Sequence, residues 1–534
     1  MVRKMKVVSM ALAVAAGMVL ASPSYGVTDN ILFNGVGSSA AFNAMALAAR
    51  MSNGGTPPSG VCGDHNWTLK NGGQAYDNRN GINGVTVANV TGSIWIVWSD
   101  VNGSGVRTVC SYLNIDSVVG NRLFFAQPRG SLLLPGITTT TAGGQLVPIL
   151  PTDETLPADV ISALNGTATT GPGGAKFNAA PSDIRPEDAL FATTRALTPL
   201  GSGGLGYGPG PVGTTILSKF STKSAQVVNY AISGTDPISG DAVPAYSTVN
   251  VGAQVVLVLV NTTNTAVGHL GSTAFKNVDR FVLAKVLDGT LGCTRDLTQS
   301  SGLPQVGLTV LEREPISGTF NTLEFSIPAS KEIGSSQEAG VNAQNPLDLS
   351  GPCGSVRQRV IGTGEMVSEI GATADSIGYA FFSFGNVSPL VTPTVVGKYL
   401  SVDGIDPIHN GYTSGTLPTC SAPCPGEIVF PNVLNGSYPI WNVLRVITSS
   451  PEPMGVASLV SAAQREVVNI PDFLAFSKLN VFRSHYLQSG VSPVNGHLAR
   501  STEAGGDMGG AVFTVQADKD YITDTGTELV NYKQ

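Results

Sequence analysis

Residues 255–260 read Val-Val-Leu-Val-Leu-Val, an unbroken apolar run of the kind found in a strand that is buried on both faces of a sheet. The segment after it has apolar residues at helical spacing from Val278 to Val286, and Gly289 is placed to end that helix. Strand-like and helix-like segments alternate in this way along much of the chain. The alternation predicts an α/β fold whose sheet is largely parallel and covered by helices.

Long stretches rich in Gly, Pro, Ser and Thr interrupt this alternation. The chain contains 64 Gly and 33 Pro residues, and only 13% of its residues are charged, which is typical of many turns and long polar loops. At 534 residues the chain exceeds one ordinary domain and fits two lobes with insertions. We interpret the longest of these stretches as loop insertions, which lie near residues 53–93, 134–180, 200–250 and 388–437.

The N-terminal segment has the pattern of a cleavable signal peptide. Basic residues at positions 3, 4 and 6 precede an apolar run over residues 7–20, and small residues follow up to Gly26. We therefore expect residues 1–26 to be removed on export, and the mature protein to be periplasmic or secreted. No later apolar run approaches the roughly 20 residues that a membrane span needs, so no integral membrane segment is expected after processing.

The charge of the mature chain argues against nucleic acid as a partner. The whole sequence carries a formal charge of −7, and its first 26 residues hold three basic and no acidic residues, so the remainder carries −10. A protein that binds nucleic acid is expected to carry a basic surface instead.

The six cysteines make an even count in an exported protein, which favours disulfides over metal binding or catalysis. Several pairings are compatible with the sequence, and we expect nearest neighbours along the chain to pair. A metal site at the last pair is less well supported, because no His lies beside it and no second pair has its spacing. The expected disulfides are Cys62 with Cys110, Cys293 with Cys353, and Cys420 with Cys424.

Four separated segments place small hydroxyl or glycine residues where a chain turn leads into a predicted helix. Backbone N–H groups at such helix starts have no intrahelical partner and can bind anions. Each segment taken singly also fits an ordinary helix cap. The segments are 34–42 (Asn-Gly-Val-Gly-Ser-Ser-Ala-Ala-Phe), 115–120 (Ile-Asp-Ser-Val-Val-Gly), 181–188 (Pro-Ser-Asp-Ile-Arg-Pro-Glu-Asp) and 312–320 (Glu-Arg-Glu-Pro-Ile-Ser-Gly-Thr-Phe).

The order of these segments resembles that of the phosphate-binding proteins of ABC transporters, a branch of the type 2 periplasmic binding proteins. In the fourth segment Arg313 precedes Ser317 by four residues, and Ser317-Gly318-Thr319 repeats the Ser-Gly-Thr of that family. Residues 374–379 (Ala-Asp-Ser-Ile-Gly-Tyr) resemble a strand of the family, and residues 438–440 (Tyr-Pro-Ile) resemble the segment that returns to the first lobe.

The resemblance implies a two-lobed type 2 periplasmic-binding-protein fold with two crossover segments and long loop insertions. Lobe I would comprise residues 27–250 and 435–534, and lobe II would comprise residues 251–434. The protein would be a monomer that captures phosphate or a similar tetrahedral oxyanion between the lobes, with an ABC permease as a candidate partner. No cofactor, metal site or enzymatic activity is expected.

The resemblance also implies a set of ligand-binding residues. Backbone N–H groups, hydroxyls and the two-pronged guanidinium of Arg313 would surround the oxyanion, so Arg313→Ala is expected to abolish binding and to leave thermal melting nearly unchanged. Asp183 would accept a hydrogen bond from an anion that still carries a proton, which favours hydrogen phosphate over sulfate. The alternative for Asp183 is a cap of the helix that contains Pro186. The expected ligand-binding residues are Ser38, Ser39, Ser117, Asp183, Arg313, Ser317, Gly318 and Thr319.

The sequence departs from the family pattern at several of these positions. Ser39-Ala40 stands where the family has Thr-Phe, and Glu314-Pro315-Ile316 replaces Ala-Asp-Gly. Glu314 and Arg185 also add charges near the expected site. These departures favour a second interpretation, an exported surface or structural protein that kept the binding-protein fold but lost or changed its ligand.

An enzyme is a weaker interpretation. Residues 505–510 resemble the Gly-Asp-Ser-Gly-Gly of serine proteases, but Met508 occupies the position of the nucleophile and cannot attack a carbonyl. No metal-binding spacing joins the five histidines, which are His65, His269, His409, His485 and His497.

Overall fold

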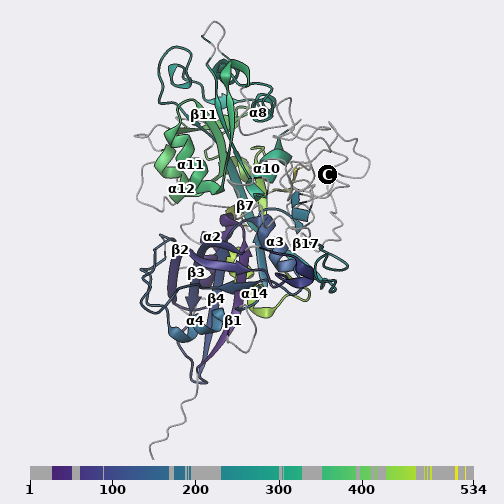
Figure 1. Ribbon diagram of the computed structural model, residues 1–534. Helices are drawn as coiled ribbons and strands as arrows, with labels where there is room; N and C mark the ends of the chain where they lie inside the picture. The colour runs from purple at the N-terminus through teal and green to yellow at the C-terminus, as the bar shows by residue number, and fades with distance from the viewer. Residues whose placement is uncertain are drawn as a thin grey trace, which may run out of the picture.

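The protein, described here by a computed structural model, has two lobes that share one mixed sheet (Figure 1). Apart from a few single positions, the structure describes residues 27–50, 61–166, 174–193, 230–299, 304–327, 351–391, 397–409, 415–417 and 428–464, with short segments at 474–475, 478, 481–483, 512–514 and 523–524. The signal peptide expected at residues 1–26 lies outside these ranges. Among the described residues, no helix is both long and apolar enough to cross a membrane.

The first lobe forms the lower part of Figure 1, and its described residues between positions 27 and 193 form six strands of the shared sheet. These strands are β1 (Thr28–Gly37), β2 (His65–Tyr76), β3 (Val90–Trp98), β4 (Val106–Asn114), β5 (Ser131–Leu133) and β6 (Ala179–Ser182). They lie in the order β6-β1-β4-β3-β2-β5. β1 pairs in parallel with β4 and β6, whereas β2, β3 and β4 form antiparallel pairs.

Helices cover both faces of this part of the sheet. They are α2 (Phe42–Arg50), α3 (Ser117–Phe125), α4 (Ala158–Asn165) and α14 (Met454–Gln464). In β3, Ile94 and Ile96 join the hydrophobic core of α3 and α4, whereas Trp95 and Val97 join the core of α2 and α14. This alternation is expected of a strand that is buried on both faces, because successive side chains point to opposite sides of a sheet.

The second lobe forms the upper part of Figure 1 around a single hydrophobic core. Its strands are β8 (Asn277–Val278), β9 (Thr309–Arg313), β10 (Val356–Val360), β11 (Ser376–Phe381) and β12 (Gly397–Val402). Its helices are α8 (Arg280–Leu287), α9 (Thr294–Thr298), α10 (Gly318–Ser326), α11 (Gly362–Ala372), α12 (Phe384–Val391) and α13 (Pro431–Leu434). β9 pairs in parallel with β10 and with β11.

Two long antiparallel strands connect the lobes, β7 (Tyr246–Asn261) and β13 (Trp441–Ser449). Val251 in β7 belongs to a core of the first lobe, while Ala253 and residues 255–260 lie in the core of the second lobe. The predicted buried strand at residues 255–260 is confirmed, since its side chains are at most 1% exposed. The lobe boundaries near residues 250 and 435 stay a prediction.

The sheet is mixed, so the expectation of a largely parallel sheet is wrong. β3 and β4 are joined by residues 99–105, which are too few for a crossover helix, and such short connections give antiparallel pairs. Residues 53–93 are also not simply a loop, because β2 lies within them. Its pairing with β3 shifts between Leu69 and Gly73, and this irregularity hides the alternating pattern of the strand.

The helix predicted after residue 278 is present but starts later. Val278 lies in β8, and Asp279 caps α8 by accepting a hydrogen bond from the N–H of Phe281 at 2.8 Å. Phe281 is 52% exposed, so it does not belong to the buried face that its spacing predicts. Gly289 follows the helix with φ of 81°, a left-handed conformation that suits glycine.

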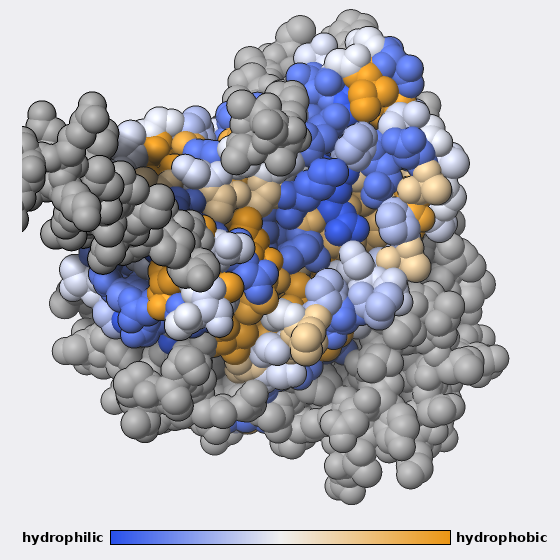
Figure 2. Space-filling model, turned by 90° about the horizontal axis from the view of Figure 1, so that it is seen from below, coloured by the Kyte–Doolittle hydropathy of each residue, from blue (hydrophilic) through white to orange (hydrophobic). Residues whose placement is uncertain are grey.

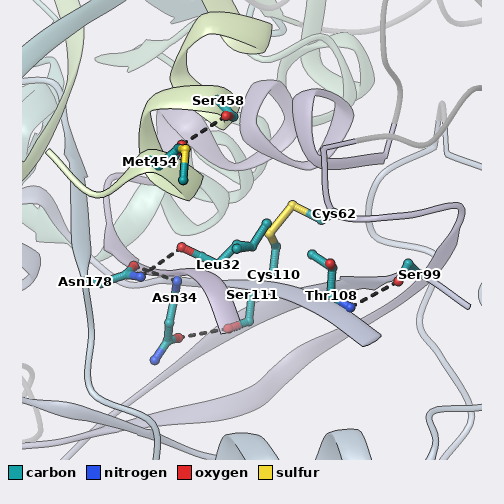
Figure 3. The surroundings of a disulfide bond; sticks show 10 residues. All are labelled: Leu32, Asn34, Cys62, Ser99, Thr108, Cys110, Ser111, Asn178, Met454 and Ser458. Carbon is teal, nitrogen blue, oxygen red and sulfur yellow. Dashed lines mark hydrogen bonds between the residues drawn. A yellow bond between two sulfur atoms is a disulfide. The ribbon is translucent and has the colours of Figure 1, made fainter. Parts of the chain in front are cut away.

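Two of the three expected disulfides are confirmed, Cys62 with Cys110 and Cys293 with Cys353. The first links the segment after α2 to the centre of β4, where Cys110 pairs with Phe33 of β1 (Figure 3). Two further cysteines, at positions 420 and 424, lie outside the described residues.

Large apolar side chains are exposed at separate points of the described surface. On the face seen from below, hydrophobic patches lie between hydrophilic ones (Figure 2). Single exposed apolar side chains are common on protein surfaces and indicate no partner by themselves. The most exposed are Val27, Val101, Val267, Phe281, Val429 and Met454.

Candidate functional site

All four segments that suggested anion binding lead into helical conformation, as expected. Ser38 follows β1 and caps the short 3-10 helix η1 (Ser39–Ala41), its Oγ accepting from the Ala40 N–H at 3.1 Å. Ser317 caps α10 by accepting from the Phe320 N–H at 3.4 Å. Helix α3 begins at Ser117. The segment 181–188 follows β6, and helical conformation begins at Pro186.

Asp183 lies where three of these segments meet. The Ser117 hydroxyl donates a hydrogen bond to the Asp183 carboxylate, which is only 3% exposed. Gly318 of the second lobe lies directly against the same carboxylate, so closely that a Cβ atom there would overlap it. The start of α3 and the start of α10 are thus both in contact with one carboxylate.

The Ser38 segment is joined to the same junction through the backbone. The Ser38 N–H donates to the Pro181 carbonyl at 2.9 Å, and the Tyr112 hydroxyl donates to the Ser38 carbonyl at 2.5 Å. Asn121 in α3 donates to the Ser117 carbonyl at 2.8 Å and to the Ser182 hydroxyl at 3.2 Å. These contacts fix β1, β6 and α3 relative to one another.

Arg313 is buried at the end of β9 and is paired with its neighbour Glu314. Arg313 Nε donates to Glu314 Oε2 at 3.0 Å, and Nη2 donates to Oε1 at 3.2 Å. Nη1 donates to the Thr363 hydroxyl at 3.2 Å. Arg313 is 2% exposed and Glu314 is fully buried, so the two charges compensate each other away from water.

Burial and neighbouring charges set the protonation of the junction. Burial raises the pKa of Asp183, and the Ser117 hydroxyl and the positive charges of Arg313 and Arg445 oppose that rise. Burial would lower the pKa of Arg313, but the attraction of Glu314 and Asp116 outweighs it and the pKa is raised. A raised carboxyl pKa brings Asp183 closer to exchanging a proton with a bound anion.

The structure places all eight expected ligand-binding residues among the described ones, but in different roles. Ser117 and Gly318 both contact the Asp183 carboxylate, and Arg313 is close enough to act on its charge. Ser38 and Ser317 serve as helix caps, Thr319 is buried in the first turn of α10, and Ser39 is half-buried in η1.

Several residues at the junction were missed by sequence reasoning. Glu314 was noted only as an added charge, yet it is the direct partner of Arg313. Asn442 donates to the Asp183 carbonyl at 2.8 Å and to the Thr322 hydroxyl at 2.6 Å. Arg445 lies in the same strand β13, and a charged residue within a buried apolar strand was the signal that could have found it.

A second group of titratable side chains lies at the edge of the first lobe. His65 Nδ1 lies 2.7 Å from Glu154 Oε2, and Nε2 lies 3.1 Å from Asp100 Oδ1 and 3.5 Å from Asp64 Oδ1. In the described part of the chain, Asp64, His65 and Asp100 have ligand atoms within 4.8 Å of one another and could hold a metal ion. An ion pair between a protonated His65 and these carboxylates explains the same geometry.

The chain was compared with known proteins. No family model matches it, and no curated protein matches it. Among solved structures it is similar to an ABC-type phosphate transport receptor from Vibrio cholerae, with 13% identity and a TM-score of 0.27 over 44% of this chain and 72% of that one.

Two further similar structures cover more of the chain. One is a high affinity periplasmic phosphate-binding protein, with 11% identity and a TM-score of 0.34 over 83% of this chain and 90% of that one. The other is an ancestral soluble variant of the human phosphate-binding protein, with 13% identity and a TM-score of 0.33 over the same shares. These neighbours are a phosphate transport receptor and phosphate-binding proteins, and likenesses this distant assign no ligand to this chain.

Gly318→Ala tests the contact between the two lobes. The added Cβ would overlap the Asp183 carboxylate, so we expect the variant to lose about 1–3 kcal/mol of unfolding free energy. Gly364→Ala is the matched control, because a Cβ at that position in α11 meets nothing within 4 Å. Alanine there should stabilise the helix by roughly 0.5–1 kcal/mol. Urea unfolding of both variants decides the point, and equal effects would show that Gly318 and Asp183 are not in contact.

His65→Gln tests the charge of the group at the edge of the first lobe. Burial alone would lower the pKa of His65, but hydrogen bonds with Glu154 and Asp100 outweigh burial and the pKa is raised. A raised histidine pKa stabilises the fold below the pKa of the unfolded chain, and that stability is lost as pH rises through the folded pKa. The variant should therefore cost about 1 kcal/mol or less at about pH 5.5 and still less at about pH 9. A cost that is the same in urea unfolding at both pH values would contradict a charged His65.

Proposed function

We propose that this chain is an exported solute-binding protein that captures phosphate or a similar tetrahedral oxyanion at the junction of its lobes. The proposal rests on the buried carboxylate of Asp183, which contacts Ser117 from the first lobe and Gly318 from the second. The positive charge of Arg313 acts on the same carboxylate. A hydroxyl, a helix start, a guanidinium and a carboxylate are together the groups that hold an oxyanion which still carries a proton.

Each of these groups would have a distinct task. Arg313 supplies positive charge and paired N–H donors, which match the spacing of two oxyanion oxygens. Ser117, Ser317 and the first N–H groups of α3 and α10 donate further hydrogen bonds. Asp183 accepts a hydrogen bond from the O–H group of the anion, which an anion without a proton cannot donate.

The wider role follows from the N-terminal pattern and from the family that the sequence resembles. We propose a periplasmic or secreted monomer that delivers its ligand to an ABC-type permease. The division into a lobe of residues 27–250 and 435–534 and a lobe of residues 251–434 is part of this proposal, because ligand would be held between the two.

One observation favours the alternative of a structural protein that kept the fold and lost or changed its ligand. The Nε–Nη2 edge of Arg313 is already occupied by Glu314, and the Ser117 hydroxyl is already bonded to Asp183. Polar groups that satisfy one another in this way can hold two lobes together without a ligand. Direct binding measurements distinguish the two functions.

Titration calorimetry of the wild type and of Arg313 variants tests the proposed function. The wild type should bind phosphate, and Arg313→Lys, which keeps a positive charge beside Glu314 but lacks the planar fork, should bind it about tenfold more weakly or worse. Arg313→Ala would leave the buried Glu314 carboxylate uncompensated at a cost of about 3–5 kcal/mol, so the expectation of unchanged melting is replaced by a clear loss of stability.

Two outcomes would count against this assignment. Unchanged phosphate affinity in Arg313→Lys would remove Arg313 from the ligand site. A folded wild type that binds neither phosphate, arsenate nor sulfate would favour the structural alternative.

Asp183→Asn tests anion selectivity. The amide can donate to an oxygen that the carboxylate could only oppose, so the preference for phosphate over sulfate should fall, mainly through a gain in sulfate affinity. As a cap of the helix that begins near Pro186, asparagine would serve as well as aspartate. Competition between the two anions at one pH measures the preference, and an unchanged preference would leave Asp183 with the capping role only.

A further inference from the structure

A second buried carboxylate, Glu314, belongs to the proposed oxyanion site. Glu314 is fully buried, and both of its oxygens accept hydrogen bonds from Arg313. The N–H of Gly362, the first residue of α11, lies 3.2 Å from Oε1 and 3.1 Å from Oε2. The carboxylate is therefore held between a guanidinium and a helix N-terminus, in a place where an anion is favourable.

The position of Glu314 decides how Arg313 can meet a ligand. A guanidinium can offer two parallel N–H donors along its Nε–Nη2 edge or across its Nη1–Nη2 end. Glu314 takes the edge, and Thr363 accepts one N–H of Nη1 at 3.2 Å. An oxyanion that binds Arg313 through two donors without displacing Glu314 has to approach the Nη1–Nη2 end.

Glu314 also changes the charge that a ligand would meet. The positive charge of Arg313 is compensated by an adjacent buried carboxylate, and Asp183 adds a further carboxylate at the same junction. Among the described residues, further charged or titratable groups near Arg313, Glu314 and Asp183 include Asp116, Arg359, Tyr379, Arg445 and Tyr112. The carboxylates of Asp183, Glu314 and Asp116 balance the guanidiniums of Arg313, Arg445 and Arg359, so these groups leave no excess positive charge to hold a dianion.

We propose that Glu314 is a specificity-determining residue of this site, which makes it select a singly charged, protonated tetrahedral oxyanion such as dihydrogen phosphate over the dianion. The inference rests on the proposed function and narrows its ligand class. Asp183 alone does not produce this preference, because hydrogen phosphate still carries the proton that Asp183 accepts. The difference in this preference between the wild type and a variant that lacks the Glu314 charge therefore isolates the contribution of Glu314.

The test is the pH dependence of phosphate affinity, measured by calorimetry through the range in which phosphate loses its second proton. In the wild type the affinity should fall as the monoanion disappears. Glu314→Gln keeps an oxygen that can accept from Arg313 but removes the negative charge. This variant should lose most of the pH dependence and bind phosphate about tenfold more tightly than the wild type at the high-pH end.

Glu369→Gln is the matched control. It makes the same substitution in α11, the helix whose first residue contacts Glu314, but at a residue outside the contacts described for the site. It should keep the wild-type profile. A Glu314→Gln profile equal to that of Glu369→Gln would overturn the inference and leave the proposed function intact.

The wild-type profile keeps the inference falsifiable even if Glu314→Gln does not fold. Wild-type affinity that stays constant, or rises, as phosphate loses its second proton would overturn the selection of the monoanion. Wild-type protein that binds neither phosphate, arsenate nor sulfate at any pH would overturn the proposed function, and the inference with it.

Discussion

The antiparallel pairing of β7 and β13 is the constraint on which the two-lobed structure depends. β7 is 16 residues long, and its residues contribute to a core of the first lobe at one end and to the core of the second lobe at the other. β13 is divided in the same way, since Val443 belongs to the core of the second lobe and Leu444 belongs to a core of the first lobe. Because both strands are almost wholly buried, their backbone groups must be satisfied by pairing within the sheet. Neither core is complete without these strands, so the fold is one connected sheet and not two independent domains joined by a linker.

The buried charges at the junction follow from this arrangement. Strand ends and helix starts from both lobes meet where β7 and β13 pass between the cores, and the polar groups at these ends are removed from water. A buried carboxylate is costly unless hydrogen bonds and opposite charge compensate it. Asp183 is compensated by a hydrogen bond from Ser117 and by the positive charges of two arginines. Glu314 is compensated by Arg313 and by a backbone N–H at the start of α11. The same compensation that stabilises an empty junction would be exchanged for ligand contacts on binding, so structure and binding compete for the same donors.

The sequence predicts local features of this protein better than its pairing pattern. The strand at residues 255–260, a helix cap in the segment 34–42 and two disulfides could be predicted, because each depends on residues close in sequence or on cysteine count and order. β2 could not, since an irregularity at Asn71 and Gly72 interrupts its alternation and its composition resembles a loop. In the site, the helix starts and Arg313 could be singled out. The pairing of Arg313 with Glu314 could not, because a residue adjacent in sequence can point toward or away from its neighbour, and only the burial of both charges decides it.

A bulge in the β7–β13 ladder connects the fold to the site. Leu444 pairs with Gly252 and Arg445 pairs with Asn250, so Val251 is the extra residue on β7 at the point where the strand passes from one core to the other. Such a bulge bends the strand and redirects side chains beside it. Arg445 also lies opposite Ser182 of β6, one residue before Asp183, and its positive charge opposes the burial of that carboxylate. Asp183 is thus compensated by Arg445 from the strands that join the lobes and by Arg313 from the second lobe. Any change in the relative placement of the lobes changes that compensation and with it the readiness of Asp183 to accept a proton. In the proposed function, proton recognition and lobe placement are therefore coupled through a single carboxylate.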